Sequence, residues 1–170
     1  ELEKAKRIRW FGIDRNAKQQ GIWENDIVET GYKYQMTDIS AAIGLAGLEE
    51  FDDALKKRQK LFSIYNQELS LFSDVKIVGV NNNDRTHASW LFTVLVEKRL
   101  DLQKKLLDVG IESNQMHFRN DRYTIFKEFW EGESFPNMDM IDDNYLVLPL
   151  HHKMSEEDVL RVCSELKRGW

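Results

Sequence analysis

The chain has 170 residues, of which 42% are apolar and 11% aromatic, enough for one hydrophobic core or for a core with an extension. Its net charge is −5, and its basic residues are interspersed with acidic ones, so it has no basic stripe of the kind that follows a nucleic-acid backbone. No apolar run approaches the roughly 20 residues of a membrane helix. We therefore expect neither nucleic acid nor a membrane among the partners.

The N-terminal stretch ELEKAKRIRW has no initiator methionine and neither the apolar core nor the cleavage site of a signal peptide. Its charged pattern is that of the end of a helix, over residues 1–9, so we expect the chain to be part of a longer polypeptide. The single Cys163 cannot form an internal disulfide, which is typical of a reducing compartment. Together these features predict a cytoplasmic protein.

Residues 10–36 lose all periodicity and are punctuated by glycine. A loop of about 25 residues this rich in tryptophan, phenylalanine and tyrosine is expected to pack on something or to serve a site. Thr37 can then cap a helix whose Ala- and Gly-rich face, over 39–47, predicts close approach of another backbone. A longer amphipathic helix follows and ends near Ser70.

After Ser70 the hydrophobic period shortens, and strands alternate with helices. Strands are predicted at 75–80, 90–97, 111–116 and 145–148, with the turn-rich stretch NNNDRTH between the first two. Helices are predicted at 100–109, where Gly110 ends the helix, at 123–130, and after Ser155, with Val159, Cys163 and Leu166 buried. The fold class is therefore α/β: a small two-layer domain over 71–170, with a mixed or mainly antiparallel sheet of about four strands, preceded by an aromatic loop and connecting helices over 1–70.

Three clusters could carry chemistry. GYKYQMTD, at 31–38, places tyrosines, Lys33 and Gln35 before a helix N-terminus, where an anion such as phosphate could bind; the alternative is a packed aromatic loop with a solvated lysine. MHFRNDRY, at 116–123, follows a predicted strand end and is suited to capture of a diphosphate or carboxylate, the alternative being a salt bridge of Arg119 or Arg122 with Asp121 or a nearby acid. RWFGIDR, at 9–15, is more typical of a structural ion pair.

Other catalytic patterns are missing from the sequence. It has no phosphate-binding glycine loop, no cysteine pair at metal spacing, and neither an HExxH nor a GxSxG pattern. His151 and His152 are adjacent, so on a strand they would point to opposite faces and could not easily share a metal. We therefore predict no metal site.

The order of motifs resembles the sugar aminotransferases of the DegT/StrS type, which depend on pyridoxal 5′-phosphate (PLP) and act on nucleotide-linked keto sugars. The family line G-Y-x-Y-x-M-(T/S)-(D/E)-I-x-A-A-I-G-L is matched by GYKYQMTDISAAIGL at 31–45. The segment GIESNQMHF at 110–118 and the segment VLPLHHKMSEEDV at 147–159 resemble the C-terminal part of the family in the same order. Essentially the whole chain is covered by the resemblance.

The resemblance implies the C-terminal part of a fold-type I PLP-dependent transferase, which is a homodimer when complete. The family passes an amino group from glutamate to PLP and then to the keto sugar, and uses a lysine that forms a Schiff base with PLP. No lysine here lies in the family's serine-proline or serine-x-x-lysine context, so we expect that lysine upstream of Glu1. The chain then has no catalytic residue of its own and should not transaminate alone.

The resemblance also assigns residues. Lys33 stands where the family often has an asparagine that reaches the PLP phosphate across the dimer interface, and Gln35 stands where arginine is common. With Tyr32 they are the expected cofactor-binding residues. His117 matches a histidine near the sugar nucleotide, and the residues after it depart from the frequent proline-containing version. We expect the substrate to be bound by His117, Arg119, Arg122, Tyr123 and Arg9.

Two alternatives remain open at this point. The first is a PLP-dependent sugar dehydratase on the same scaffold, in which histidine replaces the lysine. The second is a non-catalytic interaction module that associates through the helix at 39–47.

Overall fold

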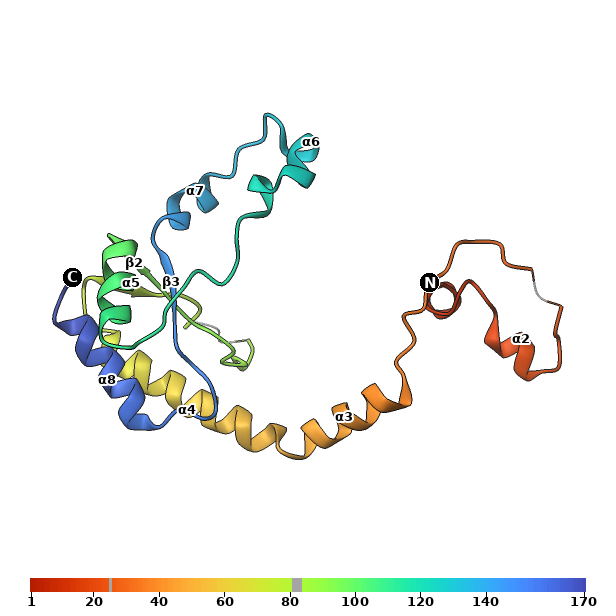
Figure 1. Ribbon diagram of the computed structural model, residues 1–170, viewed down its shortest axis with the longest axis horizontal. Helices are drawn as coiled ribbons and strands as arrows, with labels where there is room; N and C mark the ends of the chain where they lie inside the picture. The colour runs from red at the N-terminus through yellow and green to blue at the C-terminus, as the bar shows by residue number, and fades with distance from the viewer. Residues whose placement is uncertain (25, 81–83) are drawn as a thin grey trace. The chain divides into compact units, whose positions relative to one another are not determined.

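The computed structural model describes residues 1–24, 26–80 and 84–170, and divides into two compact units, Glu1–Glu50 and Phe51–Trp170. The second unit is a three-stranded antiparallel sheet packed against helices (Figure 1). The predicted α/β class is therefore confirmed. No helix in the described part of the chain is both long enough and apolar enough to cross a bilayer.

The N-terminal unit contains helices α1 (Leu2–Ile8), α2 (Arg15–Gln19) and α3 (Asp38–Glu49). Gly12 and Gly31 allow the loop that runs from one to the other to fold back until its two ends meet. A Cβ added to Gly31 would lie 1.9 Å from the Gly12 nitrogen, and Gly12 itself has a φ of +77°. Because only glycine fits this approach without strain, the loop is fixed where the chain turns into the segment that leads to α3.

Helix α3 begins as the sequence predicts, because the Thr37 hydroxyl accepts a hydrogen bond from the Ser40 backbone N–H at 3.2 Å. The helix has no buried residue. A Cβ added to Gly44 or Gly47 would meet nothing within 4 Å. The close backbone approach predicted for this face is therefore not made by the described residues.

The C-terminal unit is built on strands β1 (Val75–Ile77), β2 (Phe92–Val96) and β3 (Tyr145–Leu148), in the order β1-β2-β3. The register pairs Val75 with Val96 and Phe92 with Leu148. The strand predicted at 111–116 is wrong, because that segment makes only one isolated bridge, between Asn114 and Val147. The three asparagines predicted to turn between β1 and β2 lie outside the described residues.

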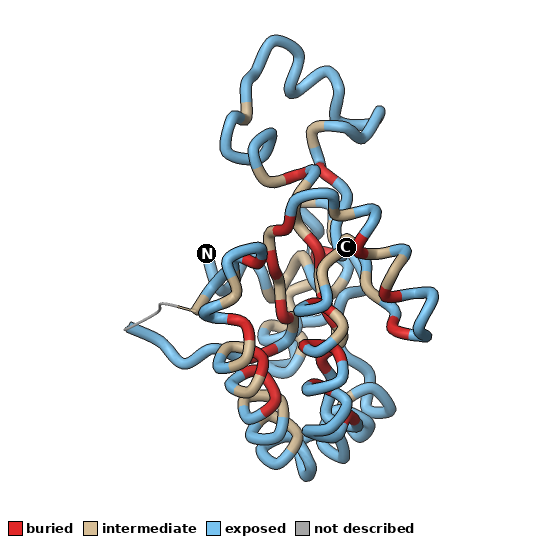
Figure 2. The backbone as a smooth tube through the Cα atoms, turned by 90° about the vertical axis from the view of Figure 1, so that its left-hand side faces the viewer, coloured by how far each residue is buried: buried red, intermediate tan, exposed pale blue. Residues whose placement is uncertain are grey.

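One face of the sheet carries the hydrophobic core. Helices α4 (Phe51–Leu69), α5 (Arg99–Asp108) and α8 (Glu156–Lys167) supply its other layer, and α4 packs directly on α8. Along β2 the side chains alternate, with Phe92, Val94 and Val96 buried against the helices. Figure 2 shows the buried residues gathered along these strands and helices. The opposite face is only partly covered, which leaves room for the cavities described below.

The segment between Arg119 and Asp142 is the least compact part of this unit. It contains two 3₁₀ turns, η1 (Asn120–Arg122) and η2 (Thr124–Phe126), and helices α6 (Lys127–Trp130) and α7 (Pro136–Asp142). The short helix predicted at 123–130 is present in part as η2 and α6, and α7 was not predicted. Most residues of the whole segment between Arg119 and Asp142 are exposed, as Figure 2 shows.

The division between the units falls at a different point from the predicted boundary between residues 70 and 71. Helix α4 belongs to the C-terminal unit because Leu61, Phe62, Tyr65 and Leu69 are buried in its core. The Tyr65 hydroxyl also donates a hydrogen bond to the Pro149 carbonyl at 2.9 Å.

Helix α8 has a capping box that offers a test of local stability. The Ser155 hydroxyl accepts from the Asp158 N–H at 3.1 Å, and the Asp158 carboxylate accepts from the Ser155 N–H at 2.8 Å, which holds the Asp158 pKa below its usual range. Ser155→Ala should lower the free energy of unfolding by about 1 kcal/mol, measured by urea denaturation. Ser164→Ala, in the same helix but away from the cap, is the control, and equal losses in the two variants would contradict the capping role.

Candidate functional site

In the N-terminal unit, backbone hydrogen bonds hold the segment 32–34 against the segment that follows α1. The Tyr32 N–H donates to the Ile8 carbonyl at 2.6 Å, and the Tyr34 N–H donates to the Arg9 carbonyl at 2.9 Å. The rings of Tyr32 and Tyr34 are stacked, with centroids 5.2 Å apart. Lys33, between them, is exposed and forms no salt bridge with any described residue. Its ammonium group is therefore available to an anion.

A small cavity of about 190 Å³ in the same unit brings Gln35 together with Arg9. Its charged lining consists of Lys6, Arg7, Arg9, Arg15, Glu3 and Asp14. Cationic groups outnumber acidic ones in this lining, and within the described residues Arg9 has no salt bridge. Tyr32 and Lys33 do not line this cavity. The structure thus joins one predicted cofactor residue with one predicted substrate residue.

The neighbours of Arg9 in this cavity have other partners. Asp14 caps α2 by accepting from the Asn16 and Ala17 N–H groups, and the Arg15 guanidinium lies 5.1 Å from the centre of the Trp10 ring. Arg7 pairs with Glu29 at 3.1 Å. The structural ion pair considered for residues 9–15 is not formed among them in the described part of the chain.

In the C-terminal unit, His117, Arg119 and Tyr123 line one cavity of about 690 Å³ on the open face of the sheet. Most of its other lining is aromatic or aliphatic, including Phe118, Trp130, Phe135, Met138 and Tyr145. Arg122 does not line the cavity and pairs with the buried Asp142, with 2.6 Å between Nη1 and Oδ2. The structure therefore groups three of the four residues predicted in this cluster.

Arg119 is only 6% exposed, and its guanidinium forms ion pairs with two carboxylates. Nε and Nη2 donate to the two oxygens of Asp121 at 2.9 and 2.6 Å, and Nη1 donates to Asp139 on α7 at 2.6 Å. These bonds lower the pKa of the Asp121 carboxyl, mainly through the hydrogen bond from Arg119. The salt bridge considered as the alternative for Arg119 is present, and it ties the loop after His117 to α7.

His117 is held from the side of the sheet. The Tyr145 hydroxyl, on β3, accepts from the His117 N–H at 2.7 Å and donates to the His117 carbonyl at 3.1 Å. The imidazole remains exposed, and its centroid lies 6.3 Å from the Trp90 ring. Neither Tyr145 nor Trp90 was predicted as a site residue, because each lies in an apolar stretch that is typical of a strand.

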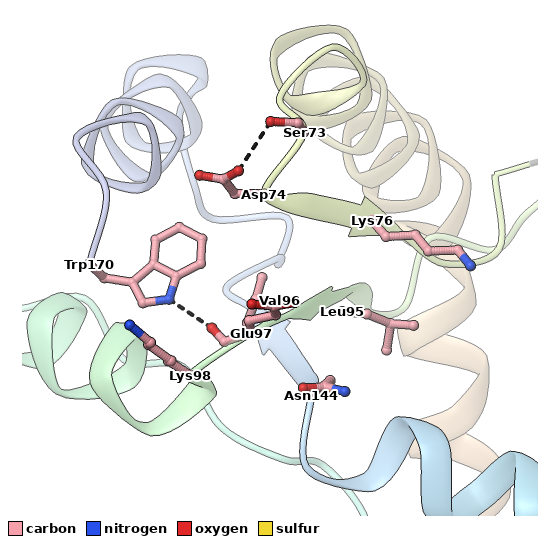
Figure 3. Close-up of a pocket in the computed structure, with 9 residues that line it drawn as sticks. All are labelled: Ser73, Asp74, Lys76, Leu95, Val96, Glu97, Lys98, Asn144 and Trp170. Carbon is pink, nitrogen blue, oxygen red and sulfur yellow. Dashed lines mark hydrogen bonds between the residues drawn. The ribbon is translucent and has the colours of Figure 1, made fainter.

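The C-terminal unit also contains a further cavity and a free, buried cysteine. A cavity of about 490 Å³ lies at the ends of β1 and β2, where the Trp170 indole donates to the Glu97 carbonyl at 2.8 Å (Figure 3). No predicted site residue lines it, and its charged lining contains two lysines, Lys76 and Lys98, and two acidic residues, Asp74 and Glu97. Burial raises the pKa of the Cys163 thiol to about 12, so the thiol stays protonated at neutral pH and is no nucleophile. In the described part of the chain no three His, Cys, Asp or Glu side chains are grouped as metal ligands would be.

Solved structures of sugar aminotransferases share this fold over part of their length. The sugar aminotransferase CalS13 from Micromonospora echinospora superposes with a TM-score of 0.87 and 28% identity, over 97% of this chain and 44% of that one. The PLP-form of the putative sugar aminotransferase Spr1654 from Streptococcus pneumoniae superposes with a TM-score of 0.80 and 25% identity, over 96% of this chain and 41% of that one. The fold of this chain is therefore that of part of a sugar aminotransferase.

The sequence comparisons name the family. Residues 1–167 match the DegT/DnrJ/EryC1/StrS aminotransferase family, and the chain belongs to it. A UDP-4-amino-4,6-dideoxy-N-acetyl-beta-L-altrosamine transaminase from Campylobacter jejuni is 25% identical over 181 residues, which is 99% of this chain and 47% of the relative. The chain spans about half the length of the curated relatives it matches.

Proposed function

We propose that this chain forms part of a PLP-dependent aminotransferase that moves an amino group from glutamate to a nucleotide-linked keto sugar. The observation that carries the proposal is the family match over residues 1–167. A relative whose name gives a UDP-linked amino sugar as the compound that it transaminates supports the substrate class. A related structure in its PLP-form supports the cofactor.

The residues of the N-terminal unit fit the phosphate of PLP. Lys33 carries a cation that no described carboxylate neutralises, and in the neighbouring cavity Arg9 likewise has no salt bridge among the described residues. A phosphate dianion needs such uncommitted donors, because each charge-assisted hydrogen bond gains more when the cation is not already paired. We assign Lys33, Tyr32 and Gln35 to the cofactor phosphate and Arg9 to an anionic group of the substrate.

When bound, PLP supplies the electron sink for amino transfer. The role left to the C-terminal unit is to bind and orient the nucleotide-linked sugar. His117 presents its imidazole from a loop whose backbone is fixed by Tyr145, while Tyr123 and the other aromatic side chains exclude water from the adjoining cavity. Arg119 and Arg122 position this loop through their ion pairs with Asp121, Asp139 and Asp142.

The lysine that attaches PLP is expected outside this chain, which gives a direct test. PLP should be added to the 170-residue chain and, separately, to the protein expressed with the coding sequence upstream of Glu1. Only the longer protein should develop a visible absorption band that borohydride removes, and L-glutamate should change that band. In the longer protein, Lys33→Ala should weaken PLP retention by roughly 10- to 100-fold, because one charge-assisted contact is lost.

The possible outcomes separate the alternatives. A borohydride-sensitive band on the 170-residue chain alone would contradict the expected position of the lysine. A longer protein that binds PLP without such a band supports a dehydratase instead. A longer protein that does not bind PLP supports a non-catalytic module. Unchanged PLP retention in the Lys33 variant would remove Lys33 from the site.

A further inference from the structure

Trp90 is placed in an unusual way at the start of β2. It is 59% exposed, although the strand that it precedes is buried along one face. Ser89, immediately before it, is 2% exposed and has a φ of +51°, a left-handed conformation that residues with a Cβ rarely adopt. Strain of this kind persists only where surrounding groups enforce it, and its result here is an indole directed out of the core.

Arg58 and His87 enforce this conformation. From α4, the Arg58 Nε donates to the Ser89 carbonyl at 3.0 Å, and Nη2 donates to the carbonyls of Trp90 and Leu150 at 2.8 and 2.9 Å. The His87 Nδ1 accepts from the Ser89 N–H at 2.9 Å. A guanidinium that binds three backbone carbonyls and no described carboxylate fixes the main chain on both sides of the indole. Trp90 is therefore exposed and pre-organised.

The indole lines a cavity of about 750 Å³ together with Glu112 and Asn114. Glu112 is exposed and pairs with no cation in residues 1–24, 26–80 and 84–170. The Asn114 Oδ1 accepts from the Gln115 N–H at 2.9 Å, which turns the amide so that its Nδ2 remains free to donate. An aromatic face, an acceptor and a donor thus border one cavity.

We propose that this cavity binds the base of the nucleotide, with Trp90 as the surface on which the base stacks. Glu112 accepts the ring N–H of the base, and Asn114 donates to an adjacent carbonyl oxygen. The proposal rests on the proposed function for the nucleotide-linked nature of the substrate. His117, 6.3 Å from the Trp90 ring, then lies beside the base-binding cavity, where it can contact the rest of the same ligand.

The acceptor at Glu112 also predicts which bases bind. Uracil, thymine and guanine each carry a ring N–H next to a carbonyl group on the edge used for base pairing. Adenine and cytosine present a ring nitrogen lone pair at that position, which a carboxylate repels, because a carboxylate only accepts hydrogen bonds. The cavity should therefore favour UDP, dTDP or GDP over ADP and CDP.

The test is a set of calorimetric titrations of the complete protein, loaded with PLP, with UDP, dTDP, GDP, ADP, CDP and inorganic pyrophosphate. At least one of the first three should bind more tightly than ADP and CDP. Trp90→Ala should weaken the binding of that nucleotide by about 5- to 100-fold, because base stacking on an aromatic side chain is lost. The affinity for pyrophosphate should stay unchanged. Trp90→Phe should retain most of the affinity, and Glu112→Gln should reduce the preference over ADP and CDP.

Phe129→Ala is the matched control, because Phe129 is an aromatic side chain, 71% exposed, that lines none of these cavities. Equal affinity of wild type and Trp90→Ala for every nucleotide overturns the proposal, as does the absence of nucleotide binding in the wild type. The change in cofactor absorbance on addition of L-glutamate should be the same in Trp90→Ala and wild type. Failure of that absorbance change in the wild type counts against the proposed function, whereas the titrations still decide the role of Trp90.

Discussion

Replacement of Phe92 by alanine should lower the free energy of unfolding of the C-terminal unit by about 3–5 kcal/mol. Phe92 is fully buried at the start of β2, where the centre of its ring lies 4.5 Å from that of Tyr65 in a stacked pair and 4.9 Å from that of Phe62 in an edge-to-face pair. Truncation removes the burial of a large side chain and leaves a cavity between sheet and helix that the two rings of α4 cannot fill. Urea denaturation of the 170-residue chain, followed by circular dichroism, measures the change.

Phe129→Ala provides the comparison for this loss, since it removes the same atoms from a ring that is already 71% exposed. A surface truncation of this kind should change the free energy of unfolding by no more than about 0.5 kcal/mol. If Phe92→Ala cost no more than the surface variant, the packing of α4 on β2 described above would be wrong.

The elements that the sequence predicts well are those whose signals are local. Helices α3 and α8 begin after the capping residues Thr37 and Ser155, and Gly110, which follows the C-cap of α5, has the predicted positive φ of +76°. Caps and hydrophobic periodicity act within one or two turns of the chain, so they can be read without knowledge of the fold. The buried stripe of α8 follows from the same periodicity, and Val159, Cys163 and Leu166 are all buried.

The elements that the sequence does not predict depend on distant partners. The segment 111–116 is predicted to be a strand, but only Asn114 pairs with β3, so the sheet has three strands. Helix α7 has only seven residues and starts at Pro136, and its Asp139 accepts a hydrogen bond from Arg119, which lies 20 positions earlier in the chain. No local pattern shows a pairing of that kind.

The same distinction applies to the candidate sites. The cluster at 116–123 is predicted because histidine and arginine follow an apolar segment, and the structure does bring His117, Arg119 and Tyr123 to one cavity. The sequence could not predict that the guanidinium groups of Arg119 and Arg122 are already paired. Their partners, Asp139 and Asp142, lie on α7, about 20 positions later in the chain. Trp90 was missed for the same reason, since alternation places it on the face of the buried Phe92 and only the conformation of Ser89 turns it outward.

Arg58→Met should lower the free energy of unfolding by about 2–4 kcal/mol, because a buried carbonyl loses a charge-assisted hydrogen bond and two further carbonyls lose theirs. Methionine keeps much of the aliphatic length of arginine, so the loss reports the guanidinium rather than its stem. Urea denaturation measures the change. Lys57→Met, at the neighbouring exposed position of α4, removes the same charge without breaking a described hydrogen bond and should cost less than about 0.5 kcal/mol.

Arg58 should also control the indole that it holds. Without the guanidinium, the left-handed conformation of Ser89 loses the bond that Nε makes to its carbonyl, and the Trp90 carbonyl loses its donor. Arg58→Met in the complete protein should therefore weaken nucleotide binding in the same direction as Trp90→Ala, although Arg58 donates only to backbone carbonyls. A variant that loses stability but binds nucleotide as wild type does would show that the indole is held by the strand itself, and that Arg58 stabilises the fold without organising the cavity.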